Sequence, residues 1–99
     1  MLVQYYIHMD LIVNHNIAIS DTGFLFNPST GESFTLNPIG VLVINCLKES
    51  KDDSEIITSI TAEYEVDEKD AERDLLDFKE VLRHFSIIIT RPENFGSHG

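Results

Sequence analysis

The sequence predicts an α+β fold in which an N-terminal antiparallel β-sheet is followed by three helices. Three observations carry this prediction. Residues 24–36 alternate between apolar and polar side chains around a central turn signal, which is typical of a β-hairpin. Asn37 and Pro38 then form a helix-start signal directly after the hairpin. From there to Phe85, apolar residues recur at helical spacing.

Length and composition indicate one globular domain, expected over residues 1–91, with a frayed tail at residues 92–99. The chain has 99 residues, of which 42% are hydrophobic, enough for a modest core. Its net charge is −10, from 7 basic and 17 acidic residues. A surface of this sign repels phosphate backbones, so nucleic-acid binding is disfavoured.

Localisation follows from targeting signals and cysteine usage. The N-terminal residues lack the basic region and the small-residue cleavage site of a signal peptide. No apolar run approaches the roughly 20 residues that span a bilayer. Cys46 is the one cysteine, which permits no internal disulfide and fits a reducing compartment. We therefore expect a cytoplasmic protein that makes no membrane contact.

Short strands are expected near both ends of the chain. Leu2–Ile7 and Leu11–Val13 are rich in β-branched and aromatic residues. Ile17–Ser20 is a short strand with turn signals on either side. Ser86–Thr90 is β-branched and predicts a closing strand after the last helix.

The central hairpin has its strands at Gly23–Asn27 and Glu32–Leu36. Pro28 favours a type I turn between them, and Gly31 can adopt the left-handed conformation that closes it. Alternation along each strand then predicts which side chains face the core. The inward-facing residues expected are Phe24, Phe26, Phe34 and Leu36, with Leu25, Ser33 and Thr35 on the opposite face.

Three helices follow the hairpin. The first begins after Asn37 and runs to about Lys48. Asp52, with Glu55 three residues later, forms a capping-box signal for the second, and Asp67 caps a long third helix with acidic residues in its first turn. The core-facing residues expected on the helices are Ile39, Leu42, Val43, Cys46, Leu47, Ile56, Ile57, Ile60, Tyr64, Ala71, Leu75, Phe78, Leu82 and Phe85.

Two residues break the pattern of the third helix on a wheel of about 100° per residue. Asp74 falls inside the apolar arc, and Leu76 falls among the charged residues. Asp74 has two interpretations: a carboxylate that accepts hydrogen bonds from a neighbouring backbone, or an acid that lines a peptide groove. Leu76 is either an ordinary exposed leucine or a partner contact.

Three other classes of protein match isolated features but not the whole chain. The Asp21–Gly23 triplet also occurs in homodimeric retroviral aspartic proteases, but those are all-β, whereas the chain is helical after Pro38. Ser54 begins a helix, as the attachment serine of acyl carrier proteins does, but Glu55 replaces the expected leucine. A DNA-binding winged helix conflicts with the acidic charge.

Catalytic and metal-binding patterns are missing from the sequence. The histidines lie far apart without metal-ligand spacing, at positions His8, His15, His84 and His98. No glycine-rich phosphate loop follows a strand, and Cys46 lies on a helix face expected in the core. We therefore expect a binding protein without enzymatic activity, cofactor or metal.

The junction between hairpin and first helix carries a family resemblance. Leu36–Val43, with the sequence LNPIGVLV, resembles the Leu-Asn-x-x-Gly-x-x-hydrophobic signature of the PqqD family, and the preceding GFLFNPSTGESFT resembles that family's hairpin. The resemblance spans roughly Ile17 to Ile88 and is closest to a subgroup associated with an HPr-kinase-like protein. It departs at Ile44, where many members have Trp, and after the last helix, where no Gly follows. The residues that match the family's third helix are Asp74, Phe78 and Leu82.

This resemblance implies a fold similar to a winged helix-turn-helix and a function as a peptide chaperone. Members of the family, and related recognition elements for ribosomally made peptide natural products, bind a precursor (leader) peptide and present it to a modifying enzyme, as in PQQ biosynthesis. The implied partners are such a peptide and its enzyme. Two alternatives stay open: an adaptor that docks on an HPr-kinase-like enzyme without holding a peptide, and a regulatory domain that forms a homodimer through its N-terminal strand.

The resemblance also implies where a peptide would bind. In that family the peptide adds as an extra strand beside the hairpin, in a groove floored by the third helix. The strand at Glu32–Leu36 would offer its unpaired edge, because β-addition supplies affinity through main-chain hydrogen bonds. The acidic side of the helix predicts a peptide with Lys or Arg among alternating apolar residues. The residues expected to contact it are Ser33, Phe34, Thr35, Leu36, Asp70, Asp74, Asp77, Phe78 and Val81.

Overall fold

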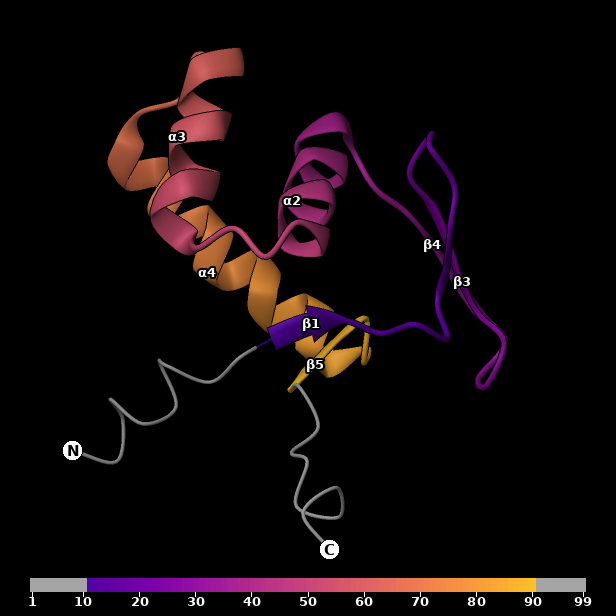
Figure 1. Ribbon diagram of the computed structural model, residues 1–99. Helices are drawn as coiled ribbons and strands as arrows, with labels where there is room; N and C mark the ends of the chain where they lie inside the picture. Colours follow the sequence, from indigo (N-terminus) through magenta and orange to yellow (C-terminus); the bar gives the residue numbers. More distant parts are fainter. Residues whose placement is uncertain (1–10, 91–99) are drawn as a thin grey trace, which may run out of the picture.

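A computed structural model describes residues 11–90 and confirms the α+β class, with strands followed by three helices (Figure 1). The elements in chain order are β1 (Leu11–Val13), β2 (Ala18–Ile19), β3 (Phe24–Asn27), β4 (Glu32–Thr35), α2 (Pro38–Lys48), α3 (Asp53–Glu63), α4 (Glu68–His84) and β5 (Ile88–Thr90). The strand expected at Leu2–Ile7 and the tail expected at residues 92–99 lie outside the described residues.

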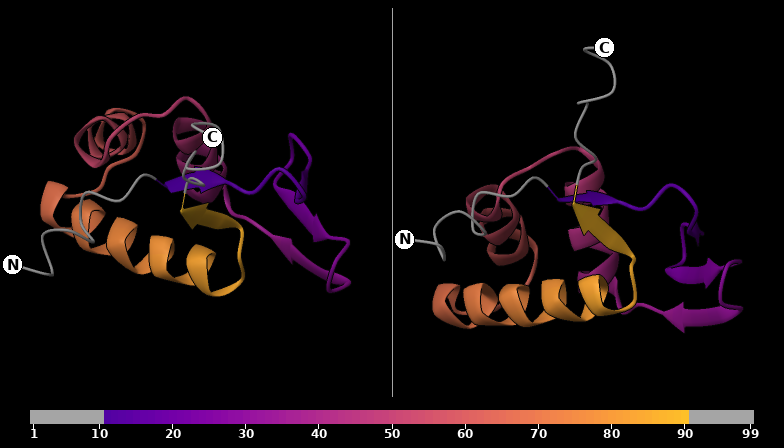
Figure 2. Two further views of the ribbon diagram at one scale, coloured as in Figure 1. Left: turned by 60° about the horizontal axis from the view of Figure 1, so that its bottom comes forward. Right: turned by 90° about the horizontal axis from the view of Figure 1, so that it is seen from below.

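The strands form two small antiparallel sheets. β2, β3 and β4 make one sheet in that order, and β1 pairs with β5 in the other. The second pairing confirms the closing strand and joins both ends of the described chain, since Leu11 lies opposite Thr90. The β3–β4 hairpin projects on the far side of α2 from α3 (Figures 1 and 2).

Each helix begins where the capping signals predicted. The Asn37 side chain accepts a hydrogen bond from the Gly40 N–H at 2.8 Å, and Pro38 occupies the first turn of α2. Asp52 and Glu55 form the capping box of α3 with bonds of 2.8 and 3.0 Å. These caps satisfy N–H groups that have no partner inside the helix.

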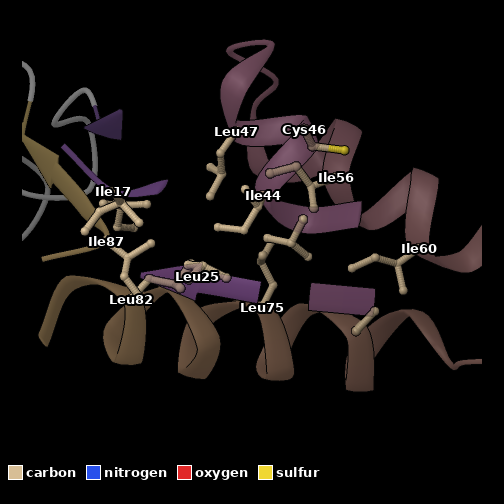
Figure 3. Close-up of a cluster of buried hydrophobic side chains, with 13 residues drawn as sticks. Ile17, Leu25, Ile44, Cys46, Leu47, Ile56, Ile60, Leu75, Leu82 and Ile87 are labelled. Carbon is tan, nitrogen blue, oxygen red and sulfur yellow. The ribbon is translucent and has the colours of Figure 1, made fainter. Parts of the chain in front are cut away.

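The core lies between α2, α3, α4, β5 and the inner face of the β3–β4 hairpin (Figure 3). It includes most of the residues expected on the helices, together with Ile44, which the helical pattern did not single out. Ile39, Leu42, Ile57, Phe78 and Phe85 are half-buried and pack against it. The fully buried large side chains are Leu25, Val43, Ile44, Ile56, Leu82 and Ile88.

The hairpin faces the core with the opposite side of β3 from the one expected. Leu25 is 0% exposed, whereas Phe24 and Phe26 are 49% and 38% exposed. Leu25 lies directly opposite Phe34, so both side chains share the inner face, and the Phe34 ring packs against Phe85 at a centroid distance of 4.7 Å. The prediction that Phe24 and Phe26 join the core is therefore wrong, while Phe34 does pack against it.

Candidate functional site

The outer edge of β4 is open in the part of the chain that the structure describes. β4 is the last strand of its sheet and pairs with β3 alone. The Leu36 N–H donates to the Gly23 carbonyl at 2.8 Å, so Gly23 and Leu36 are a hydrogen-bonded pair of the β3–β4 ladder. Because bonded and non-bonded pairs alternate along an antiparallel ladder, the N–H and C=O groups of Ser33 and Thr35 point away from β3. This edge can therefore accept another strand.

An apolar pocket adjoins the end of this edge. It has a volume of about 340 Å³ and lies between the end of β4, α2, α3 and α4. We call it the β4–α4 pocket. Its lining residues are Thr35, Leu36, Asn37, Ile39, Gly40, Val43, Ile60, Val66, Ala71, Asp74, Leu75 and Phe78. Thr35 belongs both to the open edge and to the pocket, so a strand added to β4 would run directly into it.

The Leu36–Gly40 junction shapes the mouth of the pocket. Only Leu36 and the cap Asn37 lie between the end of β4 and the start of α2. A β-carbon on Gly40 would lie 3.3 Å from Leu36 Cβ and 3.4 Å from Phe78 Cζ. Glycine at this position therefore lets α2, the end of β4 and α4 approach closely, which explains the Leu-Asn-x-x-Gly spacing in structural terms.

The residues predicted on the helix side of the site divide between the pocket lining and the rest of α4. Asp74 and Phe78 line the β4–α4 pocket, whereas Asp70, Asp77 and Val81 lie on the same side of α4 but outside the lining. The Asp74 carboxylate is exposed and lies 3.9 Å from Arg73 Nε. No backbone N–H donates to it among residues 11–90, so the interpretation of Asp74 as a carboxylate that accepts hydrogen bonds from a neighbouring backbone is wrong.

The strand side brings four expected residues together in sequence, but their side chains divide between two faces. Phe34 and Leu36 pack against the core, and Ser33 and Thr35 are exposed.

Most of the pocket wall was not predicted. The lining residues outside the expected set are Asn37, Ile39, Gly40, Val43, Ile60, Val66, Ala71 and Leu75. Asn37 and Gly40 could have been found, because they belong to the signature that carried the family resemblance.

Other kinds of site were sought in the described residues. No group of three or more His, Cys, Asp or Glu side chains between residues 11 and 90 could hold a metal ion. None of the three helices described is long and apolar enough to cross a membrane. Cys46 is a free, buried thiol.

The fold and this site together define a small α+β domain with an open sheet edge beside an apolar pocket. The family model for coenzyme PQQ synthesis protein D (PqqD) matches residues 23–88. The chain belongs to the PqqD family. The match includes β3, β4, the three helices described and the pocket between them.

Two solved structures are similar over most of the chain. One is described as TbiB1 in complex with the TbiA(beta) leader peptide; it is 30% identical, with a TM-score of 0.71, over 83% of this chain and 99% of that one. The other is described as lasso peptide synthetase B1 complexed with the leader peptide; it is 24% identical, with a TM-score of 0.74, over 81% and 98%. A comparison with curated proteins finds no significant match.

Proposed function

We propose that this chain is a peptide chaperone that binds the leader segment of a ribosomally made precursor as an extra strand on β4 and presents it to a modifying enzyme. The proposal depends above all on one observation: the outward-facing N–H and C=O groups of β4 lead directly into an apolar pocket. The backbone groups supply affinity, and the pocket supplies selectivity for an apolar side chain. The two similar structures, each solved with a leader peptide, support it.

The proposed peptide contacts follow from the position of each element. Ser33 and Thr35 would bond the peptide backbone, and Leu36, Asp74 and Phe78 would contact its side chains in the pocket. The further residues proposed to line its path, as one stripe along α4, are Asp70, Asp77 and Val81. In this role the chain itself carries out no chemistry, and the reaction belongs to the enzyme that receives the peptide.

The choice between this function and an adaptor for an HPr-kinase-like enzyme depends on peptide binding. An adaptor of that kind has no need for an open edge and an adjoining apolar pocket. A homodimer formed through the N-terminal strand likewise leaves β4 unused. Loss of peptide binding on blocking β4 would thus favour the chaperone, whereas a wild-type protein that binds no leader peptide would favour the adaptor.

A proline at position 35 tests the proposal directly. The Thr35 N–H faces the open edge, so Thr35→Pro removes a donor for the peptide without removing a bond to β3. We expect the variant to stay folded and its affinity for leader peptides encoded beside its gene to fall by about tenfold or more. The lost main-chain hydrogen bond and the clash of the proline ring with the added strand together cost more than about 1.4 kcal/mol of binding free energy. Isothermal titration calorimetry measures the affinity, and circular dichroism monitors the fold.

Two matched variants complete this experiment. Thr35→Ser keeps the N–H and shortens the side chain, so it should bind almost as the wild type does. Phe34→Pro removes a donor that faces β3 and the ring that packs on Phe85, so it should unfold the hairpin rather than block binding. If Thr35→Pro binds leader peptide with unchanged affinity, the peptide does not add to β4.

A further inference from the structure

A second groove lies between α3 and α4, on the other flank of the core-facing stripe of α4. It has a volume of about 330 Å³ and is lined from both helices, with Ile57 and Thr58 on α3 and Glu72 and Leu76 on α4. Leu76 is 53% exposed, and Ile57 is half-buried. We propose that this α3–α4 groove binds a basic amphipathic helix of a partner protein, at a site separate from the β4 edge.

The negative charge around the groove indicates that the partner segment is positively charged. Glu68 and Glu72 are exposed on its wall, and neither has an ion-pair partner among residues 11–90. Apolar side chains framed by uncompensated carboxylates suit a segment that places leucine-like residues between lysines or arginines. An acidic or purely apolar segment would leave these carboxylates repelled or desolvated.

One carboxylate of the groove wall, Asp53, is already paired with a lysine of the protein itself that lies outside the groove lining. The Lys79 ammonium lies 2.9 Å from Asp53 at the start of α3, and the Lys79 side chain is only 19% exposed. Its hydrocarbon stem therefore packs while its charge meets a carboxylate of the groove wall. This internal contact is an example of the recognition that we propose for a partner's lysines.

The secondary structure around the groove favours a helix as the occupant. Both walls are α-helices, whose backbone groups beyond the first turn are bonded within each helix, so no sheet edge is offered here. A partner must therefore bind through side chains, as an amphipathic helix does when it lies in an apolar groove. The β4 edge, in contrast, offers backbone groups and suits an extended segment.

The two sites lie on opposite flanks of α4, and the lining residue that they share is the buried Leu75. At about 100° per residue, Asp74, Phe78 and Val81 lie on one side of the helix, and Glu72 and Leu76 lie on the other. Leader peptide and partner helix can therefore bind at the same time. We take this partner to be the modifying enzyme, an assignment that rests on the proposed function, whereas the docking itself does not depend on leader binding.

The test uses a synthetic amphipathic helical peptide with leucine at every third or fourth position and lysine or arginine between. Its control is the same peptide with glutamate in place of each basic residue. In an NMR titration we expect the basic peptide to shift amides of Ile57, Thr58 and Glu72–Leu76, and the shifts to weaken as salt rises. Leu76→Lys and Glu72→Lys should each weaken binding by about tenfold or more, because both place a cation against the basic peptide.

A matched charge reversal separates the groove from the general acidity of the protein. Glu80→Lys lies on the same helix but outside both pockets, so it should change the affinity much less than Glu72→Lys does. Equal effects of the two reversals, equal binding of the acidic peptide, shifts confined to Thr35–Gly40, or no shifts at about 1 mM peptide would overturn the proposal. Leader-peptide titration of Leu76→Lys keeps the two hypotheses apart: it should still shift β4, and a protein that binds no leader can still bind the basic helix.

Discussion

The helical part of the molecule and the β2–β4 sheet use their apolar residues differently. α4 buries Ala71, Leu75 and Leu82 on one stripe and presents charged residues over most of its remaining surface. β3, with only four residues, buries Leu25 and exposes two phenylalanines on its other face. The helices thus turn most of their apolar surface inward, whereas the sheet leaves aromatic surface and one backbone edge uncovered.

This difference separates stability from recognition. Burial of side chains such as Leu82 and Ile56 contributes to the free energy of folding, whereas an exposed ring contributes little. The exposed features of the sheet therefore carry little of the stability and are available for contacts with other molecules. Substitutions on the two faces of the sheet, and at its junction with the helices, test this separation.

The largest contrast is expected between two neighbours in β3. Leu25→Ala should lower the free energy of unfolding by about 2–5 kcal/mol, as for other buried leucines, and Phe24→Ala by less than about 1 kcal/mol. Chemical denaturation of both variants measures the difference. If Phe24→Ala costs as much as Leu25→Ala, the outer face of the sheet is covered and the comparison fails.

The junction between the two parts should be the next most sensitive position. Gly23 has φ of +93°, and a β-carbon there would lie 2.9 Å from both the Leu36 carbonyl oxygen and Val41 Cγ2. Gly23→Ala should therefore destabilise the protein by about 2–3 kcal/mol through backbone strain and displacement of α2. Gly31→Ala is the matched control, because φ there is also positive but no atom lies within 4 Å of the added carbon. Thermal unfolding that ranks the two variants equally would contradict this account of Gly23.

Phe78 lies where stability and recognition meet. It is half-buried, packs against the core and lines the β4–α4 pocket. We expect Phe78→Ala to cost about 2 kcal/mol in stability, below the 3–5 typical of a buried phenylalanine, and also to weaken leader binding. Denaturation and calorimetry on the same variant measure both effects. A variant with wild-type affinity for leader peptide would remove Phe78 from the site.

The smallest effect is expected at an exposed charge beside the pocket. Asp77→Lys should leave stability unchanged and weaken binding of a Lys- or Arg-containing leader peptide by about two- to fivefold at low salt. The loss should shrink as salt rises, because exposed charges are screened over about 8 Å at physiological ionic strength. Titrations at two salt concentrations measure it, and an unchanged affinity at low salt would show that α4 does not flank the peptide.

The elements were predictable because their signals are local. Asn37, Asp52 and Asp67 each begin a helix at the position expected, since a cap depends on a few adjacent residues. The inner face of β3 was not predicted, because alternation groups residues by face without saying which face meets the helices. The strand register would have identified the inner face of β3. A four-residue loop after Asn27 places Leu25 opposite Phe34, and Phe34 was correctly predicted to face the core.

The candidate site was harder to predict than the fold. The strand edge and two residues of α4 follow from neighbours in sequence, but the walls from Ile39, Ile60 and Val66 belong to separate elements that meet only after packing. Asp74 illustrates the same limit. A helical wheel places it inside the apolar arc, yet the pocket there leaves its carboxylate exposed.

The burial of Cys46 has a consequence for experiments on the motions of this protein. It is the one cysteine of the sequence, and its side chain is only 4% exposed, inside the contact of α2 with the core. A thiol reagent can reach it only when that contact opens. When reclosing is faster than alkylation, the alkylation rate reports the free energy of opening. The natural thiol therefore provides an intrinsic kinetic reporter of core opening, with and without bound peptide, in the unmodified protein.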